Sequence, residues 1–309
     1  MINNFKEKLV SCLNSEIQVN EPMKKHTTYG IGGTADIFIL PNKKEELIKI
    51  VKLSKEFNQE LTVIGSGSNL LISDNGIRGI VISLKNCLKS INIDKNKIYV
   101  ECGIMLGKLV KESMKHDLKG LENLIGVPGT LGGALIMNAG AWGGEISKNL
   151  EEVEILNDKD EIEILKKSDI DFAYRSSSFT EKTILLSASF KLKKSSKQVI
   201  EENFELAKSG RKNSQPLNYR SAGSVFKNPS AEHSAGLLID QSGLKGLKIG
   251  DAQISNKHAN FFVNNGNAKA DDMISLIKKA KNAVQKKYNI NLDLEVKLLG
   301  FKPDEIKGL

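Results

Sequence analysis

Cysteine, proline and tryptophan are scarce in this chain: its 309 residues include three, six and one of them, respectively. Cys12, Cys87 and Cys102 have no paired spacing, so the sequence predicts neither a disulfide framework nor a zinc site. The four histidines are scattered, and we therefore expect no metal. No apolar run reaches membrane-spanning length, and residues 1–14 are too charged for a signal peptide. We expect a cytoplasmic protein without membrane contact.

Charge of one sign is not concentrated in any block, although the formal net charge is +8. Such a balance is compatible with nucleic acid or with anionic small molecules as partners. Lysines recur along one predicted helix, at positions 278, 279, 281, 286 and 287, without the interleaved aromatic residues typical of a nucleic-acid groove. The sequence therefore predicts a solvated, lysine-rich surface and no nucleic-acid partner.

The length of the chain predicts two or three domains. Apolar residues recur at helical spacing in several segments, and short apolar runs between turn residues predict strands. Expected helices cover Phe5–Leu13, Lys43–Phe57, Leu106–His116, Lys197–Ser209, Ala235–Gln241 and Ala270–Tyr288. Expected strands cover Ala35–Leu40, Leu61–Ile64, Gly79–Leu84, Leu88–Ile93, Ile98–Cys102, Ile184–Leu192, Gly223–Phe226, Asn260–Val263 and Leu292–Leu299. The composition changes after the charged helix, which predicts a domain border near residue 205.

The most informative segment is Gly126–Gly144, which is uncharged and contains seven glycines. Glycine is costly inside regular structure, so this density needs a physical reason. A bare backbone can bring N–H groups close to a bulky ligand, and such groups in turns and at helix starts favour phosphate oxygens. A flexible linker would be richer in serine and poorer in Leu, Met and Trp. The segment predicts the wall of a cofactor site, with tight helix–strand packing as the alternative.

A second glycine turn, Gly65-Ser-Gly-Ser-Asn69, lies between a predicted buried strand and the apolar run Leu70–Ile72. Its glycines and hydroxyls suit a diphosphate cradle. It is not the dinucleotide fingerprint, because Leu70 stands where the third glycine would fall. Taken with Gly126–Gly144, the turn predicts a nucleotide fold of a different kind, although an ordinary glycine turn would have the same composition.

Polar residues gather in four further segments. Tyr174–Phe179 contains Arg175, whose planar guanidinium can hold a carboxylate through two hydrogen bonds, although the segment by itself favours an ordinary surface turn. Gly210–Pro216 contains two cations and two amide side chains, which suit a second anion or a solvated helix end. Arg220–Pro229 places Ser224 after a glycine as a candidate proton donor or nucleophile, and no hydrolase elbow surrounds it.

The fourth segment, Leu292–Gly300, alternates like a strand with one buried face. Glu295 falls on the face opposite Leu294 and Val296, and periodicity alone therefore predicts that its side chain is exposed to solvent.

Together these segments resemble the UDP-N-acetylenolpyruvoylglucosamine reductase (UDP-N-acetylmuramate dehydrogenase) family, flavoenzymes of bacterial cell-wall precursor synthesis. The matching pieces follow the family's order and are Thr28–Ala35, Gly65–Leu71, Leu121–Gly144, Tyr174–Phe179, Gly223–Pro229, Lys257–Asn264 and Leu294–Gly300. The resemblance implies an α+β fold. Its parts would be an FAD-binding domain of the vanillyl-alcohol-oxidase (PCMH) type, residues 1–205, with two α+β subdomains at about 1–86 and 87–205. A C-terminal α+β substrate-binding domain, residues 206–309, would contribute Glu295 to the active site from its last strand.

The resemblance also implies the reaction. NADPH would reduce FAD, and the hydride would then reach the vinyl carbon of the enolpyruvyl ether on UDP-N-acetylglucosamine, giving UDP-N-acetylmuramate for peptidoglycan. The family's catalytic residues fall on Arg175, Ser224 and Glu295. Arg175, and Glu295 if protonated, would stabilise the charge that develops on the substrate carboxylate, and Ser224 would donate a proton to the adjacent carbon.

Further site residues follow from the same motifs. For FAD, chiefly through the backbone, they are Gly65, Ser66, Gly67, Ser68, Asn69, Pro128, Gly129, Thr130, Gly133, Asn138, Ala139 and Gly140. For the UDP-sugar they are Tyr174, Arg211, Gln215, Asn228 and His258. Phe179 leads almost directly into the strand Ile184–Leu192, so the chain resembles the shorter subtype without the inserted loop whose Tyr closes over the substrate.

Two other hypotheses are compatible with parts of the sequence. A different flavin oxidase could use the same cofactor domain, but the motifs Gly223–Pro229 and Leu294–Gly300 disfavour it. A non-catalytic sugar-nucleotide binding module would not need the paired glycine segments Gly65–Asn69 and Gly126–Gly144.

Overall fold

The computed structural model describes the backbone of residues 2–309, and its packing divides the chain into two compact units. The first unit contains the residues up to Val19, Ile37–Ser66 and Gly79–Arg211. The second contains Asn20–Asp36, Gly67–Arg78 and Lys212–Leu309. The predicted functional domains, 1–205 with its two subdomains and 206–309, are not tested by this division and stay predictions.

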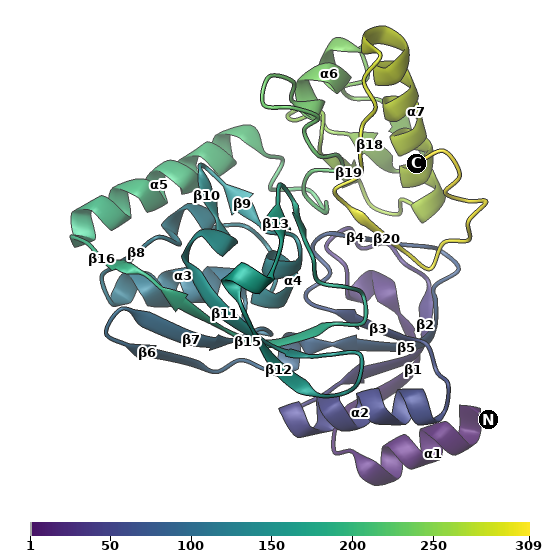
Figure 1. Ribbon diagram of the computed structural model, residues 1–309. Coiled ribbons are helices and arrows are strands. Elements are labelled where there is room, and N and C mark those ends of the chain that lie inside the picture. The colour runs from purple at the N-terminus through teal and green to yellow at the C-terminus, as the bar shows by residue number, and fades with distance from the viewer. Residues whose placement is uncertain (1) are drawn as a thin grey trace. The chain divides into compact units, whose positions relative to one another are not determined.

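A five-stranded antiparallel sheet in the order β12-β11-β15-β7-β6 is central to the first unit (Figure 1). Its strands are β6 (Ile91–Asp94), β7 (Lys97–Glu101), β11 (Leu150–Leu156), β12 (Ile162–Lys166) and β15 (Ile184–Lys191). Helices α3 (Leu106–Lys115) and α4 (Leu131–Ile136) share one apolar core with the sheet through Leu109, Leu135, Val153 and Phe190. Helix α5 (Lys197–Ser214) adds Ala207 to this core.

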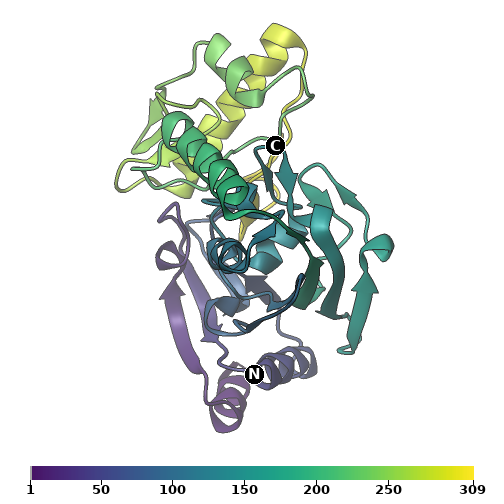
Figure 2. The ribbon, with the colours of Figure 1, turned by 90° about the vertical axis from the view of Figure 1, so that its left-hand side faces the viewer.

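A second core of the first unit lies around the N-terminal helices α1 (Ile2–Cys12) and α2 (Lys44–Glu56), which lie side by side (Figure 2). Phe5 of α1 and Leu47 of α2 are fully buried in it together with Ile80. The four-stranded sheet has the order β1-β2-β5-β3, with β3 (Leu61–Ile64) parallel to β5 (Ile77–Ser83). Its other strands are β1 (Glu16–Pro22) and β2 (Thr34–Leu40).

The second unit contains a three-stranded antiparallel sheet in the order β17-β18-β19. These strands are Lys248–Ile249, Ala252–Ile254 and Phe262–Asn264. Helices α6 (Ala235–Gln241) and α7 (Ala270–Tyr288) pack against one another, and α7 also packs on the sheet (Figure 1). In the same unit, β4 (Leu70–Ile72) pairs in parallel with β20 (Lys297–Leu299).

Short pairings complete the fold. They are β8 (Leu118–Lys119) with β16 (Lys193–Lys194), β9 (Gly140–Ala141) with β10 (Gly144–Glu145), and β13 (Phe172–Ala173) with β14 (Ser176–Ser177). The last two pairs are hairpins with two-residue turns, because Ala141 lies opposite Gly144 and Ala173 lies opposite Ser176. These two turns carry Trp142 and Arg175.

Most predicted elements are confirmed, and those that fail lie in the second unit or at element ends. Gly223–Phe226 is not a strand, since Ser224 and Phe226 make only isolated bridges, to Phe261 and Leu294. The predicted strand Leu292–Leu299 is reduced to Lys297–Leu299. Helix α5 continues to Ser214, past the predicted end at Ser209. The predicted strand at Leu88–Ile93 begins only at Ile91, because Leu88 adopts a left-handed φ of 56°.

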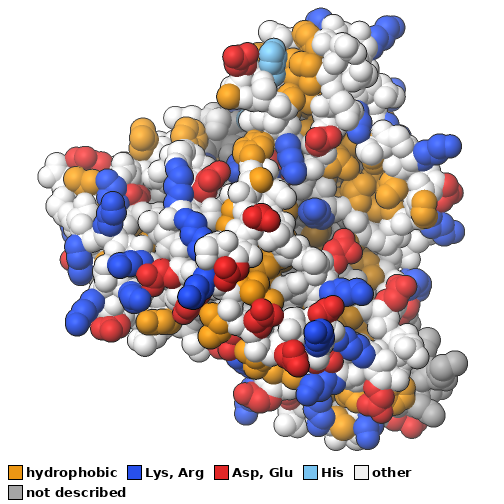
Figure 3. Space-filling model, viewed as in Figure 1, with side chains coloured by type: hydrophobic (Ala, Val, Ile, Leu, Met, Phe, Trp, Pro, Cys, Tyr) orange, Lys and Arg blue, Asp and Glu red, His pale blue; other side chains and the backbone are white. Residues whose placement is uncertain are grey.

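Basic and acidic side chains alternate over the surface seen in Figure 3, with no basic stripe, as expected of a solvated lysine-rich surface. Within residues 2–309 no helix combines the length and apolarity needed to cross a membrane. In the same range no cluster of three His, Cys, Asp or Glu side chains could hold a metal ion. All three cysteines are free thiols, and burial raises the pKa of Cys87 to about 11.

Candidate active site

The two glycine-rich segments meet in the first unit. A Cβ at Gly65 would overlap the hydroxyl of Thr130, so only glycine allows this approach. Thr130 is the N-cap of α4, and its side chain accepts a hydrogen bond from the Gly133 N–H at 3.4 Å. Gly129 precedes it with a φ of 129°. The structure thus brings Gly65 against the Thr130 side chain, while the predicted contact of Gly65, Gly129 and Thr130 with a cofactor stays a prediction.

Each of the two glycine-rich segments contains a buried polar atom that has no partner among the described residues. Ser66 Oγ and Asn138 Oδ1 are both buried and make no hydrogen bond with any described residue. Asn138 is 2% exposed and has a left-handed φ of 39°, while its Nδ2 donates to the Ala173 carbonyl at 3.0 Å. Buried polar atoms without partners are rare because desolvation is costly. Two of them, one in each glycine-rich segment, indicate that a polar ligand supplies the missing hydrogen bonds.

The start of α4 does not supply free donors, which corrects the expectation that a helix start in this segment binds phosphate. The N–H groups of Leu131 and Gly132 donate to the carbonyls of Ile104 and Cys102, both at 2.9 Å. The Gly133 N–H is taken by Thr130. The glycines of this helix instead permit close packing, since a Cβ at Gly132 would lie 3.4 Å from Cys102.

The other predicted cofactor residues fall into two groups. Ala139 and Gly140 follow Asn138 in the first unit, and a Cβ at Gly140 would lie 3.1 Å from Arg175 Nη1. Gly67, Ser68 and Asn69 belong to the second unit. There, a Cβ at Gly67 would overlap the His26 carbonyl, and Asn69 Nδ2 donates to the Glu295 carbonyl at 2.9 Å. Pro128 is exposed. For all of these residues, contact with a cofactor stays a prediction.

Arg175 occupies the β13–β14 turn with a φ of 53°. This conformation is strained for a residue other than Gly or Asn and costs about 1–3 kcal/mol, so it points to a functional constraint. Its Nη2 donates to the Gly140 carbonyl at 2.7 Å, and its guanidinium lies 5.0 Å from the centre of the Tyr174 ring. These contacts hold the guanidinium against the glycine-rich segment. Tyr174 itself is 46% exposed.

Arg211, near the end of α5, is a second cation in the same region. Its side chain is only 8% exposed, and burial lowers its pKa, with the nearby positive charge of Arg175 as a further cause. Two guanidiniums close enough to repel one another favour a bound anion, which would relieve the repulsion. The sequence singled out both residues, and the structure brings them into one neighbourhood.

Ser224 and Glu295 come together in the second unit, although they are 71 positions apart (295 − 224). The Glu295 N–H donates to the carbonyl of Val225, the residue after Ser224, at 2.8 Å. Glu295 is half-buried, so the exposure predicted from periodicity is wrong. The reason is tertiary: the chain around Glu295 pairs with the Ser224 segment and with Asn69 instead of continuing a regular strand.

The residue that fixes this segment, Asn260, was not singled out from the sequence. It is 3% exposed and its carboxamide makes two hydrogen bonds to Phe226: Oδ1 accepts from the N–H at 2.9 Å, and Nδ2 donates to the carbonyl at 2.8 Å. The Asn260 carbonyl also accepts the Val225 N–H at 2.9 Å. In the sequence Asn260 stands between Ala259 and Phe261, and nothing in this local pattern indicates its long-range role.

Asn228 and His258 both lie near the first turn of α6, where a Cβ at Gly236 would lie 3.0 Å from the His258 ring. Asn228 Oδ1 accepts the N–H of Ala235 at the start of this helix, at 3.0 Å. His258 accepts the Asn260 N–H at Nδ1, at 3.2 Å, and its ring packs on Phe261. Burial lowers the pKa of His258, and the charge of Lys245 lowers it further. The neutral ring therefore has its proton on Nε2, which can donate to a ligand, and substrate binding by both residues stays a prediction.

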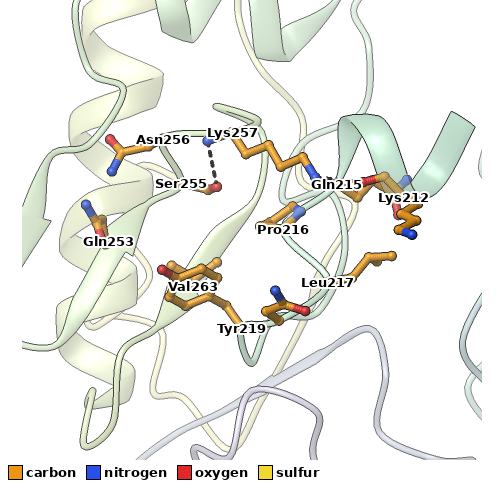
Figure 4. Close-up of a pocket in the computed structure, with 11 residues that line it drawn as sticks. Lys212, Gln215, Pro216, Leu217, Tyr219, Gln253, Ser255, Asn256, Lys257 and Val263 are labelled. Carbon is orange, nitrogen blue, oxygen red and sulfur yellow. Dashed lines mark hydrogen bonds between the residues drawn. The ribbon is translucent and has the colours of Figure 1, made fainter.

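Gln215 lines a cavity of about 610 Å³ in the second unit (Figure 4). The loop after α5 forms one side with Pro216 and Tyr219, and β18, β19 and the turn between them form the other with Gln253, Ser255 and Val263. Lys257 reaches across toward the helix end, where its Nζ donates to the Lys212 carbonyl at 2.7 Å. Asn228 and His258 do not line this cavity, so the predicted substrate residues of the second unit do not form one pocket wall.

Known proteins resemble this chain over almost its whole length. Residues 35–166 match the FAD binding domain family, and residues 215–299 match the C-terminal domain of UDP-N-acetylenolpyruvoylglucosamine reductase. The reductase of Listeria welshimeri is 44% identical over 92% of this chain and 95% of its own length. That of Desulforamulus reducens is 41% identical over 94% and 96%. The crystal structure of the Thermus caldophilus reductase superposes with a TM-score of 0.78 at 35% identity, covering 93% of this chain and 99% of that one.

The fold and the glycine-rich site thus define an α+β flavoprotein with an FAD-binding domain of the PCMH type and a second, C-terminal domain. Within that class, the chain belongs to the UDP-N-acetylenolpyruvoylglucosamine reductase family. Both the fold class and the family expected from the sequence are confirmed.

Proposed function

We propose that this chain catalyses the NADPH-dependent reduction of UDP-N-acetyl-3-O-(1-carboxyvinyl)-glucosamine to UDP-N-acetylmuramate. The reaction is a step in peptidoglycan precursor synthesis, and we place it in the cytoplasm. The observation that carries the proposal is the hydrogen bond between Glu295 N–H and the Val225 carbonyl. It holds a carboxyl group beside a hydroxyl-bearing turn in the domain that matches the reductase family.

FAD, when bound, carries a hydride from NADPH to the terminal vinyl carbon of the substrate. The first unit offers a chemically suitable site for it. Ser66 Oγ and Asn138 Oδ1 are buried without partners, and Gly65 allows the backbone to approach Thr130 closely. We assign the predicted cofactor residues of this unit, from Gly65 to Ser66 and from Pro128 to Gly140, to the support of FAD, chiefly through backbone groups.

The catalytic roles follow from the charge that moves during the reaction. When the hydride adds to the terminal carbon, the electron pair of the double bond shifts toward the substrate carboxylate. We assign Arg175 to that carboxylate, because a guanidinium can bind both of its oxygens. Glu295 in its protonated form donates a further hydrogen bond to the same charge. Ser224 gives its hydroxyl proton to the adjacent carbon and is reprotonated from water, which completes the lactyl ether.

We assign the UDP-sugar to the remaining predicted residues, Tyr174, Arg211, Gln215, Asn228 and His258. The buried cation Arg211 suits an anionic group of the substrate. His258 suits a hydroxyl or carbonyl oxygen, because its neutral ring keeps a proton on Nε2. Gln215 and the lysines of its cavity, Lys212 and Lys257, suit a phosphate.

The spectrum of the purified protein tests this function. We expect a yellow protein whose flavin absorbance at about 450 nm bleaches with NADPH and returns when the enolpyruvyl sugar nucleotide is added without oxygen. The control is UDP-N-acetylglucosamine, which lacks the double bond and should leave the flavin reduced. A protein that cannot take up FAD, or a reduced protein that only oxygen reoxidises, would refute the proposal.

The cofactor site is tested by Gly65→Ala. The new methyl group would overlap Thr130 at the N-cap of α4, and overpacking of this kind costs about 1–3 kcal/mol. We expect FAD to bind about tenfold or more weakly, measured by flavin fluorescence during titration of the apoprotein. Gly107→Ala in α3 is the matched control, because nothing lies within 4 Å of its Cβ. Equal FAD affinity in both variants would contradict a cradle at Gly65.

A further inference from the structure

Trp142, the only tryptophan of the chain, lies at the tip of the β9–β10 hairpin. Its φ is 50° and that of Gly143 is 78°, so both residues of the two-residue turn are left-handed. Turns of this type strongly favour Asn-Gly, and a bulky residue in the first position is strained. The indole is nevertheless 46% exposed. A strained backbone that presents an aromatic ring to solvent needs a functional reason.

The indole rests on a second unusual residue, Gly210 of α5. A Cβ at Gly210 would overlap the six-membered ring of Trp142, so any other residue would displace the ring. A glycine inside a helix costs about 1 kcal/mol relative to alanine. The hairpin tip is tied down as well, since Asn123 Nδ2 donates to the Trp142 carbonyl at 2.8 Å and Lys148 Nζ donates to the Gly143 carbonyl at 2.6 Å. Two locally unfavourable residues, Trp142 in the turn and Gly210 in the helix, thus together hold the indole in one position.

The hairpin and the helix that hold the ring also carry contacts of the two arginines of the candidate site. Gly210 is followed directly by the buried Arg211. At the base of the same hairpin, the Gly140 carbonyl accepts the hydrogen bond from Arg175 Nη2. All of these residues belong to the first unit. A half-exposed aromatic ring on a hairpin whose base binds one guanidinium, against a helix that carries another, suits a ligand that joins an apolar ring face to a carboxylate.

We propose that Trp142 binds the pyranose ring of the enolpyruvyl sugar substrate, with the C–H face of the sugar packed on the exposed indole. The proposal rests on the proposed function, in which Arg175 holds the enolpyruvyl carboxylate. In that substrate only an ether oxygen and one carbon separate the pyranose from the carboxylate. A ligand held by Arg175 at its carboxylate therefore places its sugar ring within reach of the adjacent hairpin. Dispersion and burial of apolar surface then favour stacking on the indole.

The half-reactions of the FAD-loaded enzyme test the proposal. In Trp142→Ala we expect the rate of bleaching by NADPH to stay within about twofold, because the proposal assigns the indole to the sugar and not to the nicotinamide. The substrate concentration that gives half-maximal reoxidation should rise about tenfold, and Trp142→Phe should recover most of this loss. Tyr99→Ala is the matched control, since Tyr99 is equally exposed at 46% but lies on the five-stranded sheet. A slowed reduction step with normal reoxidation would overturn the proposal and assign the ring to the nicotinamide.

Tryptophan fluorescence gives a second test that needs no variant. Because Trp142 is the only tryptophan, its emission reports on this position alone. We expect a saturable change when the enolpyruvyl sugar nucleotide is added to the oxidised holoenzyme without NADPH, and no change in Trp142→Phe. Unchanged emission at a substrate concentration that saturates reoxidation would overturn the proposal, whether or not Trp142→Ala folds. Failure of the native enzyme to bleach and reoxidise would instead refute the proposed function.

Discussion

Replacing Ser224 by alanine is expected to leave reduction of the flavin by NADPH intact and to slow its reoxidation by the enolpyruvyl substrate about 10²–10⁴-fold. The variant loses the group that protonates the substrate carbon after the hydride arrives. Stopped-flow absorbance of the two half-reactions measures the two steps separately. When the variant reacts in D₂O, mass analysis should find solvent-derived deuterium only in the small amount of product that the residual activity forms.

The Ser224 hydroxyl is a weak acid, so it can protonate the substrate carbon only if it is held close to that carbon. The structure supplies that position through the backbone: Ser224 bridges to Phe261, and the next residue holds the Glu295 N–H. Removal of one oxygen from a half-buried side chain should disturb neither contact, since both use main-chain atoms. The loss of rate is therefore expected without a loss of FAD or of folding stability.

The matched control is Ser221→Ala, three positions away in the same segment and equally half-buried. It should reoxidise at the native rate. If Ser224→Ala reoxidised as fast as Ser221→Ala, Ser224 would not be the proton donor. If both variants lost FAD or unfolded at a lower temperature than the native protein, the role of the segment would be structural. The catalytic assignment would then be wrong.

Local pattern alone was sufficient for the longer elements. The helices Ala235–Gln241 and Ala270–Tyr288 end where the apolar repeat predicts, because each repeat faces one core along the whole helix. The strand Leu61–Ile64 also has the predicted bounds. The segment Gly126–Gly144 was recognisable because its Leu, Met and Trp content disfavours a flexible linker. Periodicity cannot show that segments far apart in the sequence contribute to one site. Only the resemblance of these motifs to one family indicated this.

The short segments around Ser224 and Glu295 could not be predicted in this way. Alternating apolar residues at Leu292–Leu299 favour a strand, but the chain there pairs with two neighbours in turn: first with Val225 and Phe226, then with Leu70. A regular ladder is lost because neither neighbour runs alongside the whole segment. Asn260 escaped prediction for the same reason, since its hydrogen bonds reach Phe226, 34 positions away.

The cofactor side of the site shows a comparable limit. Glycine density predicted close approach to a ligand, and the structure shows in addition that Gly65 lies close to the Thr130 side chain. It did not show which donors remain free, because the N–H groups at the start of α4 are used by Ile104 and Cys102 from elsewhere in the chain. The sequence likewise could not show that Asn138 Oδ1 and Ser66 Oγ are buried without partners. Hydrogen-bond satisfaction is a tertiary property, and it depends on residues that the motif does not contain.

Arg175→Lys is expected to lower the rate of reoxidation by substrate about 10²–10³-fold while the rate of reduction by NADPH is retained. Lysine keeps the positive charge but offers a point charge instead of a planar fork, so it cannot hold both oxygens of the carboxylate. In the native protein the fork is preorganised by the left-handed turn, the bond to the Gly140 carbonyl and the Tyr174 ring. None of these contacts orients an ammonium group equally well.

Arg78→Lys is the control for the loss of a guanidinium as such, because Arg78 is 61% exposed in its pair with Asp36. It should leave both half-reactions unchanged. In Arg175→Ala, added guanidinium ions should restore part of the reoxidation rate, a rescue that no structural role of Arg175 would produce. A normal reoxidation rate in Arg175→Lys would show that charge alone suffices. The carboxylate would then be held by other groups, and the strain at Arg175 would need a different cause. A rate that falls and is rescued only by a planar cation would instead make the fork, fixed at φ 53°, the element that stabilises the developing charge.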